Sequence, residues 1–114
     1  MGYKNDISFD DRCIESMKIR QKYPDRVPTV IERAPKSSCP ELQKRKFLVP
    51  NDLTASQLLH VIRKHLKLDH SKALYIYINN ILPCYSDPIL TLYGQYKDDD
   101  GFLYILYDTE SAFG

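Results

Sequence analysis

The amino-acid sequence predicts a single α+β domain in which a helix packs across one face of a sheet. Three observations carry this prediction. A capping pattern opens an amphipathic segment at 54–67, two strand-like segments at 27–33 and 44–50 flank a turn, and an apolar segment at 102–107 lies near the C-terminus. A chain of 114 residues is typical of one domain and can bury a core without covalent cross-links.

Residues 1–24 are predicted to be a short tail followed by helical material, counted as two helices. Ser8 can cap a helix whose first turn carries Asp10 and Asp11, and acidic side chains suit the positive N-terminal end of a helix. Pro24 then ends the helix, because the residue before a proline avoids helical angles. The buried stripe of this helix is expected to consist of its sparse apolar residues: Ile14, Met17 and Tyr23.

The segments 27–33 and 44–50 are predicted to form an antiparallel hairpin. The first contains the adjacent apolar residues Val30 and Ile31, as expected of a strand that is covered on both faces. The connection at 34–43 holds two prolines and two serines, which is typical of a turn.

The second of these segments has the character of a strand at a sheet edge. Pro50 has no N–H to donate, so the strand must end there or lie at an edge. Alternation along the strand places Lys46 and Leu48 on one face and Phe47 and Val49 on the other. An extended acidic and hydrophobic peptide could add to this edge as a further strand. The alternative is a core strand preceded by solvated cations.

The clearest predicted helix follows at 54–67. Thr54 and Gln57 form a capping-box pattern, and Leu53 and Leu58 occupy the hydrophobic-staple positions. Cations crowd the last turn, where the helix dipole favours them, so they have a structural explanation without any function. The apolar stripe recurs at helical spacing and consists of Leu58, Val61, Ile62 and Leu66, widened by Leu59.

The remainder of the chain is predicted to alternate between strands and turns. A strand at 74–78 is followed by an asparagine turn, and Pro88 opens a short helix. The segment 102–107 is apolar throughout, which indicates a central strand covered on both faces. Residues 108–114 are expected to be a mobile tail.

This order of elements is that of a β-grasp, the ubiquitin-like fold, preceded by a two-helix N-terminal segment. The single domain at 1–114 would comprise the helical segment 1–24, the β-grasp core 25–107 and the tail 108–114.

Composition excludes several classes of protein. The net charge is +1, which argues against wholesale binding of nucleic acid, although the basic residues gather in the first two thirds of the chain. Three cysteines without CxxC spacing predict inert thiols in a reducing, cytoplasmic compartment. The histidines at 60, 65 and 70 lack zinc spacing, so no metal site is predicted. The longest apolar run is too short to span a bilayer.

The chain ends in Phe113-Gly114. A terminal glycine has no side chain to obstruct an attacking group, so its carboxylate could be activated and transferred to an amine. The alternative is that the glycine is an arbitrary end of the sequence.

Several motifs resemble those of the GABARAP-type (Atg8-like) ubiquitin-like autophagy modifiers. The resemblance runs from about Glu15 to the last residue. The motifs that carry it are Lys18 to Pro28, Glu32-Arg33-Ala34-Pro35-Lys36, Lys46-Phe47-Leu48-Val49-Pro50, Asp52-Leu53-Thr54, Ile62-Arg63-Lys64, Tyr77-Ile78-Asn79-Asn80, Leu92-Tyr93, Asp100-Gly101-Phe102-Leu103-Tyr104 and Phe113-Gly114.

The resemblance implies a modifier and not an enzyme. A processing cysteine protease would expose Gly114, and activating and conjugating enzymes would transfer it to phosphatidylethanolamine on the autophagosome membrane. That lipid would be the only covalent group, and no cofactor is implied. The membrane-bound protein would recruit autophagy receptors that carry an aromatic-x-x-aliphatic motif with acidic flanks.

The resemblance also assigns residues to docking sites. The pocket for the aromatic anchor would be lined by Glu15, Ile19, Pro28, Val30, Lys46, Leu48 and Phe102. The pocket for the aliphatic anchor would be lined by Phe47, Val49, Pro50, Leu58, Val61 and Ile62. Acidic flanks would meet Lys22, Arg26, Lys44, Arg45 and His65. A second docking face would comprise Tyr75, Ile76 and Tyr77.

The sequence departs from the family pattern at three places. The N-terminal segment lacks the His-Pro and paired-arginine pattern, His65 stands where arginine is usual, and Cys84-Tyr85-Ser86-Asp87-Pro88 differs from the usual loop. Two other functions compete with the lipid-conjugated modifier. One is an unconjugated soluble adaptor for receptor trafficking or the cytoskeleton that uses the same pockets, and the other is a small cysteine hydrolase.

Overall fold

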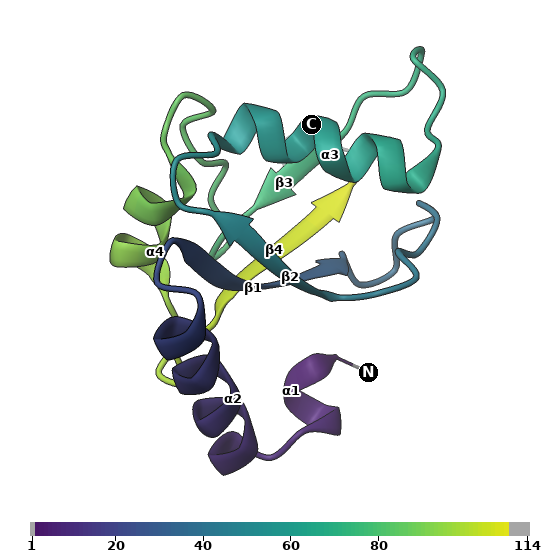
Figure 1. Cartoon of the computed structure of the whole chain (residues 1–114). Coiled ribbons are helices and arrows are strands. Elements are labelled where there is room, and N and C mark those ends of the chain that lie inside the picture. The colour runs from purple at the N-terminus through teal and green to yellow at the C-terminus, as the bar shows by residue number, and fades with distance from the viewer. Residues whose placement is uncertain (1, 110–114) are drawn as a thin grey trace.

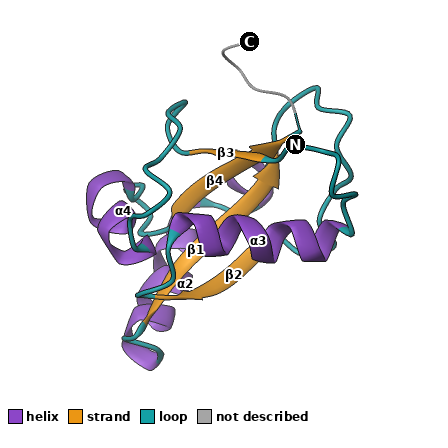
Figure 2. Cartoon of the chain, turned by 90° about the horizontal axis from the view of Figure 1, so that it is seen from above, coloured by secondary structure: helices purple, strands orange, loops and turns teal. Residues whose placement is uncertain are grey.

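A four-stranded sheet separates one long helix from a pair of N-terminal helices in the computed structural model, which describes residues 2–109 (Figure 1). Helix α3 crosses one face of the sheet, α1 and α2 lie against the other, and α4 sits at one end (Figures 1 and 2). In chain order the elements are α1 Tyr3–Asp6, α2 Phe9–Lys22, β1 Arg26–Arg33, β2 Lys46–Pro50, α3 Ala55–Leu66, β3 Tyr75–Tyr77, α4 Ile89–Tyr96 and β4 Leu103–Asp108.

The strand order β2-β1-β4-β3 confirms the predicted β-grasp. β1 pairs antiparallel with β2 and parallel with β4, and β3 pairs antiparallel with β4. Val30 and Ile31 are both fully buried, as expected of a central strand that is covered on both faces. β2 pairs only with β1, so the prediction of an edge strand is also confirmed.

The capping chemistry of α3 is as predicted. The Thr54 hydroxyl accepts from the Gln57 N–H at 3.2 Å, and the Gln57 side-chain oxygen accepts from the Thr54 N–H at 2.9 Å. Leu58, Ile62 and Leu66 are buried against the sheet. The helix ends at Lys67, whose φ of 54° places it in the left-handed region.

β4 is interior, but the expectation that both its faces would be fully covered was only partly right. Leu103, Ile105 and Tyr107 are buried in the core beneath α3, whereas the alternate residues are half-buried. The second face is covered by the N-terminal helices, and Tyr104 packs there against a small cluster formed by Tyr3, Val30 and Phe102. Helix α1 is only a single turn, and α2 buries the polar residues Arg12 and Ser16 on this face instead of an apolar stripe.

Two expectations for the N-terminal segment were wrong. The predicted tail forms the helical turn α1, and Tyr3 is only 2% exposed. Ser8 caps α2 as predicted, but the predicted buried stripe faces outward, with Ile14 52% and Met17 59% exposed. Tyr23, the third residue of the predicted buried stripe, is also exposed, at 37%. The residues of α2 that are buried are Arg12 and Ser16.

A buried ion pair explains this inversion of α2. The Arg12 guanidinium donates to the Asp100 carboxylate at 2.6 Å, and the Asp100 side chain is completely buried. The same carboxylate accepts from the Tyr104 hydroxyl and from the Phe102 N–H. A buried charge is tolerated when it is paired and hydrogen-bonded, so the polar side of α2 must face the sheet.

The loop before β4 is shaped to receive α2. The Ser16 hydroxyl donates to the Asp100 carbonyl, and Gly101 has a φ of +90°. A Cβ atom at Gly101 would lie 2.4 Å from the Ser16 hydroxyl oxygen. Glycine is therefore required at this position both by its backbone angle and by the closeness of α2.

The described part of the chain, residues 2–109, contains no helix with the length and apolar character needed to cross a bilayer.

Loss of Arg12 should destabilise the fold severely. Arg12→Met leaves the Asp100 carboxylate buried without its cation, which should lower the free energy of unfolding by about 3–5 kcal/mol. Lys4→Met is the matched control, because Lys4 pairs with Asp98 in a half-exposed ion pair worth less than about 1 kcal/mol. Urea unfolding of both variants checks this, and equal losses would contradict it.

Candidate functional site

The open edge of β2 leaves backbone groups free for a partner strand. The Ile31 N–H donates to the Arg45 carbonyl at 2.8 Å, which sets the side on which β2 pairs with β1. In an antiparallel pair the alternate residues point their N–H and C=O groups the other way, so those of Lys46 and Leu48 face outward. The Leu48 carbonyl accepts from the Arg26 side chain at 3.3 Å. Pro50 ends this edge because it has no N–H.

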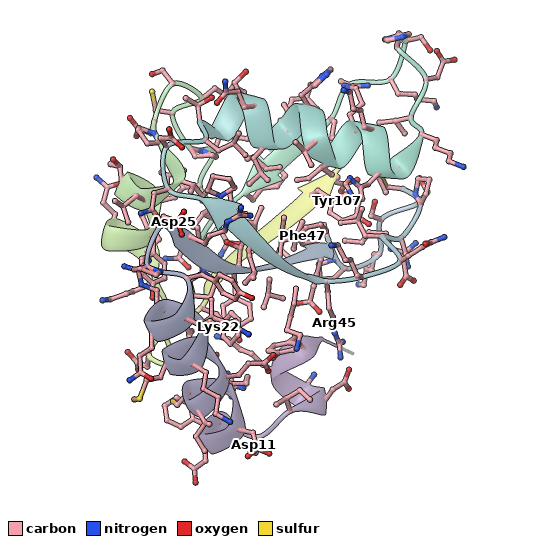
Figure 3. All side chains as sticks on the ribbon, in the orientation of Figure 1. Asp11, Lys22, Asp25, Arg45, Phe47 and Tyr107 are labelled. Carbon is pink, nitrogen blue, oxygen red and sulfur yellow. The ribbon has the colours of Figure 1, made fainter. Side chains whose placement is uncertain are left out.

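Alternation divides the side chains of β2 between the two faces of the sheet. Lys46 and Leu48 stand opposite Val30 and Pro28. Phe47 and Val49 stand opposite Thr29 and Val27. Figure 3 labels Phe47 beside β2. The two expected pocket groups are therefore on opposite faces of one edge strand. By the same alternation Pro50 shares the face of Lys46 and Leu48, at the end of the strand.

The residues expected to hold an aromatic anchor come together on the α2 face. Val30 and Phe102 are fully buried in one cluster, and Ile19 packs against it. The Lys46 ammonium of β2 forms an ion pair with Glu15 of α2, and this contact links the edge strand to the helix beside the cluster. Pro28 and Leu48 are paired partners at its rim.

Sequence analysis missed Tyr3 as a member of this group. Its hydroxyl donates to Glu15 at 2.9 Å, and its ring meets the Phe102 ring edge-on with centroids 5.6 Å apart. The Tyr3 N–H donates to Glu32 at 2.8 Å. The one signal for Tyr3 in the sequence is an aromatic residue in an otherwise polar N-terminal stretch.

Glu15 is held in its charged form. Partial burial alone would raise the pKa of its carboxyl group, but hydrogen bonds from Lys46 and Tyr3 outweigh burial and hold the pKa below its usual value. Burial and the bond to Glu15 together raise the pKa of the Tyr3 hydroxyl, which therefore stays a donor.

Apart from Pro50, which points to the other face of the sheet, the residues expected to hold an aliphatic anchor lie between β2 and α3. Leu58 and Ile62 are buried and belong to the main core, and Val61 beside them is half-buried. The Phe47 ring meets the His65 ring edge-on with centroids 5.8 Å apart. The Lys44 ammonium also lies over the Phe47 ring, 4.8 Å from its centroid. Val49 is buried, so the accessible surface here comes from Phe47 and Val61.

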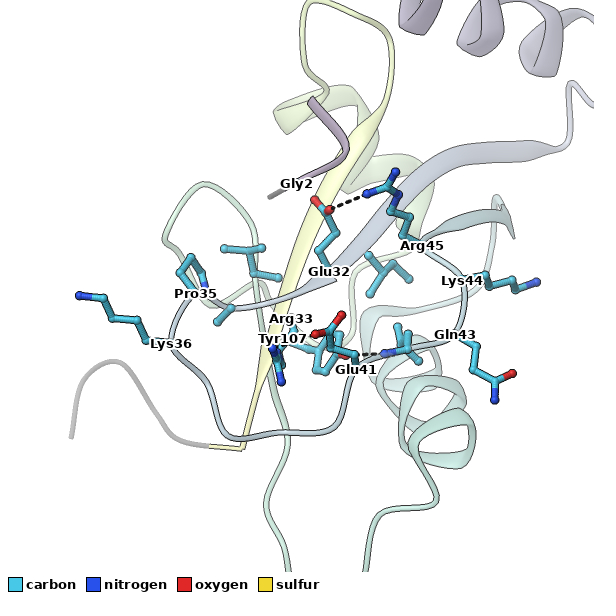
Figure 4. Close-up of a pocket in the computed structure, with 14 residues that line it drawn as sticks. Gly2, Glu32, Arg33, Pro35, Lys36, Glu41, Gln43, Lys44, Arg45 and Tyr107 are labelled. Carbon is cyan, nitrogen blue, oxygen red and sulfur yellow. Dashed lines mark hydrogen bonds and ion pairs between the residues drawn. The ribbon is translucent and has the colours of Figure 1, made fainter. Parts of the chain in front are cut away.

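The five residues expected to meet acidic flanks do not form one free patch. Arg45 pairs with Asp6 at 2.7 Å and lies 4.0 Å from Glu32, beside α1 (Figures 3 and 4). Within residues 2–109, no ion pair engages Lys22, Arg26, Lys44 or His65. Lys22 lies over the Tyr23 ring, and His65 Nδ1 is 3.0 Å from the Val61 carbonyl.

Two hollows adjoin this surface. The smaller, of about 410 Å³, is lined by Leu42, Gln43, Lys44 and His65 and continues the Phe47 side of β2. The larger, of about 770 Å³, lies between the hairpin connection and the far ends of β1 and β4 (Figure 4). Its lining mixes Glu32 and Glu41 with Arg33, Lys36 and Arg45, so it has no single charge preference.

Comparison with known proteins decides the family. The model of the family described as "Autophagy protein Atg8 ubiquitin like" matches residues 11–114. The chain belongs to the Atg8 family. Autophagy-related protein 8e of Arabidopsis thaliana is 46% identical, with 98% of this chain and 92% of that protein covered. Autophagy-related protein 8 of Schizosaccharomyces pombe is 47% identical, with 98% and 93% covered.

Solved structures agree with this assignment. The crystal structure of Trypanosoma brucei ATG8 matches with a TM-score of 0.92 and 39% identity, covering 100% of this chain and 98% of that one. Plasmodium falciparum Atg8, solved in complex with a Plasmodium falciparum Atg3 peptide, matches with a TM-score of 0.90 and 38% identity, covering 97% and 98%. This Atg8 family member is thus a ubiquitin-like autophagy modifier and not an enzyme, as the sequence predicted.

Other predicted features of this Atg8 family member are placed as follows. Gly114 lies outside the described residues 2–109. In the second docking face Ile76 and Tyr77 are largely buried, so Tyr75 supplies most of its accessible surface. Burial raises the pKa of the Cys13 and Cys39 thiols, which makes them poor nucleophiles, and no cluster in residues 2–109 has the ligands for a metal ion.

The Glu15 pairing should make stability depend on pH. A carboxyl group whose pKa is depressed by folding contributes stability above its unfolded pKa, and that contribution is lost as pH falls through the folded pKa. The melting temperature of the wild type should therefore fall as the pH drops below about 4.3, the ordinary pKa of a glutamate in an unfolded chain, because the unfolded chain takes up the proton first.

Glu15→Gln should show a lower melting temperature at neutral pH and a smaller further drop in acid. Glu41→Gln is the control, because Glu41 is a 72% exposed side chain paired only with Arg33 at the surface. Thermal melts between about pH 3 and 7 distinguish the two variants, and parallel curves for wild type and Glu15→Gln would contradict the role of Glu15.

Proposed function

We propose that this Atg8 family member, of the GABARAP type, is conjugated through Gly114 to phosphatidylethanolamine of the autophagosome membrane. There it recruits receptors that carry an aromatic-x-x-aliphatic motif with acidic flanks. The observation that carries the second half of this proposal is the open edge of β2, flanked by one side-chain group on each face of the sheet.

An extended peptide fits this edge by simple geometry. Residues three apart in a strand point to opposite faces, because side chains alternate. A peptide that pairs with the outward backbone groups of Lys46 and Leu48 would therefore direct its aromatic residue to one face and its aliphatic residue to the other. One of these faces carries the residues expected to hold an aromatic anchor, such as Ile19 and Phe102. The other carries those expected to hold an aliphatic anchor, such as Phe47 and Val61.

Acidic flanks of the receptor would meet Lys22, Arg26, Lys44 and His65. Arg45 and Lys46 are paired with Asp6 and Glu15 of the N-terminal helices, so an acidic peptide must compete with these carboxylates for them. Arg45 and Lys46 therefore contribute less to the free energy of peptide binding than the unpaired residues do. A new ion pair with the peptide only replaces one that already exists, and exposed ion pairs differ little in free energy.

The remaining partners follow from the same proposal. The conjugating enzyme is proposed to bind as a peptide, a proposal supported by the Plasmodium falciparum Atg8 that was solved with an Atg3 peptide. An activating enzyme and a processing cysteine protease act on the Gly114 end, and the protein moves between the cytoplasm and the autophagosome. Tyr75, with Ile76 and Tyr77 beneath it, provides a second docking face for other partners.

Removal of Gly114 should abolish membrane association, because the unobstructed glycine carboxylate that would join the lipid is replaced by that of Phe113. The fold and the affinity for a motif peptide should be unchanged, since β2 and the side-chain groups beside it are formed by residues within the described range 2–109. Flotation of membranes from starved cells compares the Gly114 deletion with wild type. Equal recovery in the membrane fraction would favour the unconjugated adaptor.

Truncation of Leu48 should weaken peptide binding. Buried anchor contacts commonly contribute about 2 kcal/mol or more, so Leu48→Ala should raise the dissociation constant of an acidic aromatic-x-x-aliphatic peptide by more than about tenfold. Leu90→Ala is the control, since Leu90 is an exposed leucine on α4. Peptide titration by calorimetry, with a thermal melt of each variant, measures this, and wild-type affinity in a folded Leu48→Ala protein would refute the site.

A further inference from the structure

Helix α2 carries an apolar stripe on its solvent side. Phe9 is 48%, Ile14 52% and Met17 59% exposed, and Cys13 lies between them at helical spacing. These four residues are named the α2 stripe. In the other helices of residues 2–109, the exposed large apolar side chains are limited to Leu90 of α4. A contiguous exposed apolar surface on a rigid element indicates an interaction site.

The stripe is anchored firmly enough to serve as an interface. On its inner side α2 is held by the buried Arg12–Asp100 pair and by Ser16. The Arg12 guanidinium also lies 5.5 Å from the centroid of the Phe9 ring. The apolar residues therefore cannot rotate inward without breaking a buried ion pair.

The charged residues near the stripe are acidic in the first turn of α2 and basic in its second half. Asp10 and Asp11 occupy the first turn of α2, and Lys18 and Lys22 occupy its second half, so that Asp11 and Lys22 lie toward opposite ends in Figure 3. Asp11 and Lys18 are about two helical turns apart, so they lie on the same edge of the helix. Within residues 2–109, Asp10, Asp11 and Lys18 have no ion-pair partner.

This arrangement is complementary to itself in one orientation. When two identical helices pack antiparallel about a two-fold axis, each edge meets the same edge of the other helix. Asp11 of one copy then faces Lys18 of the second copy, and the reverse contact forms as well. The axis passes near Ile14, at the centre of the stripe. In a parallel two-fold arrangement each edge would meet the opposite edge of the second helix, so Asp11 and Lys18 would not face each other.

We propose that the α2 stripe is a self-association surface, on which two copies of this chain pair through antiparallel α2 helices. A second copy fits better than an anionic lipid surface, because Asp10 and Asp11 at one end of the stripe would be repelled by it. One face of a 14-residue helix buries less than the roughly 1,200 Å² of a stable interface, so the dimer is weak and forms at high local concentration. The proposal does not depend on lipid conjugation.

Sedimentation equilibrium of the full unconjugated chain tests the proposal. Between about 20 μM and 1 mM the average mass of wild type should rise from 13.3 kDa towards twice that value, as expected of a weak dimer. Met17→Glu places a charge in the stripe and should stay monomeric throughout. Leu90→Glu is the matched control on α4 and should dimerise like wild type.

A charge exchange tests the orientation. Asp11→Lys and Lys18→Asp should each raise the dimer dissociation constant several-fold, and the double variant should restore it, because both ion pairs are then rebuilt with reversed sign. Asp11→Asn serves as a milder variant, since a lysine in the first turn of a helix opposes its dipole. Circular dichroism confirms that each variant is folded.

Three outcomes would overturn the proposal. The first is a wild type that stays monomeric at about 1 mM, where a weak dimer would be populated. The second is a double variant that is no better than the single variants, and the third is a Leu90→Glu protein that loses dimerisation as Met17→Glu does. Binding of the monomeric wild type to vesicles rich in phosphatidylserine, lost in Met17→Glu, would instead assign the stripe to a lipid surface.

Discussion

The buried pair of Arg12 and Asp100 is the interaction on which the arrangement of this protein depends. It joins the first helical segment to the loop before the last strand, and both side chains are almost fully removed from water. Because a buried charge must keep its partner, α2 has one permitted orientation about its own axis. That orientation sets Glu15 against Lys46 of β2 and Ile19 against the cluster of Val30 and Phe102, and it leaves Phe9, Ile14 and Met17 facing solvent.

The central place of β1 has an equally direct consequence for the docking surface. β1 uses both of its edges, one for β2 and one for β4, so β2 is left with an open side. The helices then cover opposite faces of the sheet, which turns a single edge strand into the shared wall of two side-chain groups. A backbone ladder between two groups can recognise a short extended peptide without a deep cavity.

The electrostatics of the site are balanced by the N-terminal helices. Asp6 and Glu15 hold Arg45 and Lys46, and Tyr3 holds Glu15 through its hydroxyl. These contacts make the added N-terminal segment part of the proposed docking surface and not a mere extension of the ubiquitin-like core. A substitution of Tyr3 or Asp6 in α1 should therefore alter the ion pairs of Arg45 and Lys46 at β2.

The features that the sequence determined by itself are local ones. The caps at Ser8 and Thr54, the hairpin of β1 and β2, and the end of β2 at Pro50 depend on neighbours within a few residues. The order of helices and strands along the chain was then enough to predict the β-grasp fold. The inner face of α2 and the insertion of Tyr3 were decided by tertiary structure, because their partners Asp100 and Phe102 lie far along the chain. Hydrophobic periodicity assumes that apolar residues face inward, and it fails where a buried ion pair outweighs them.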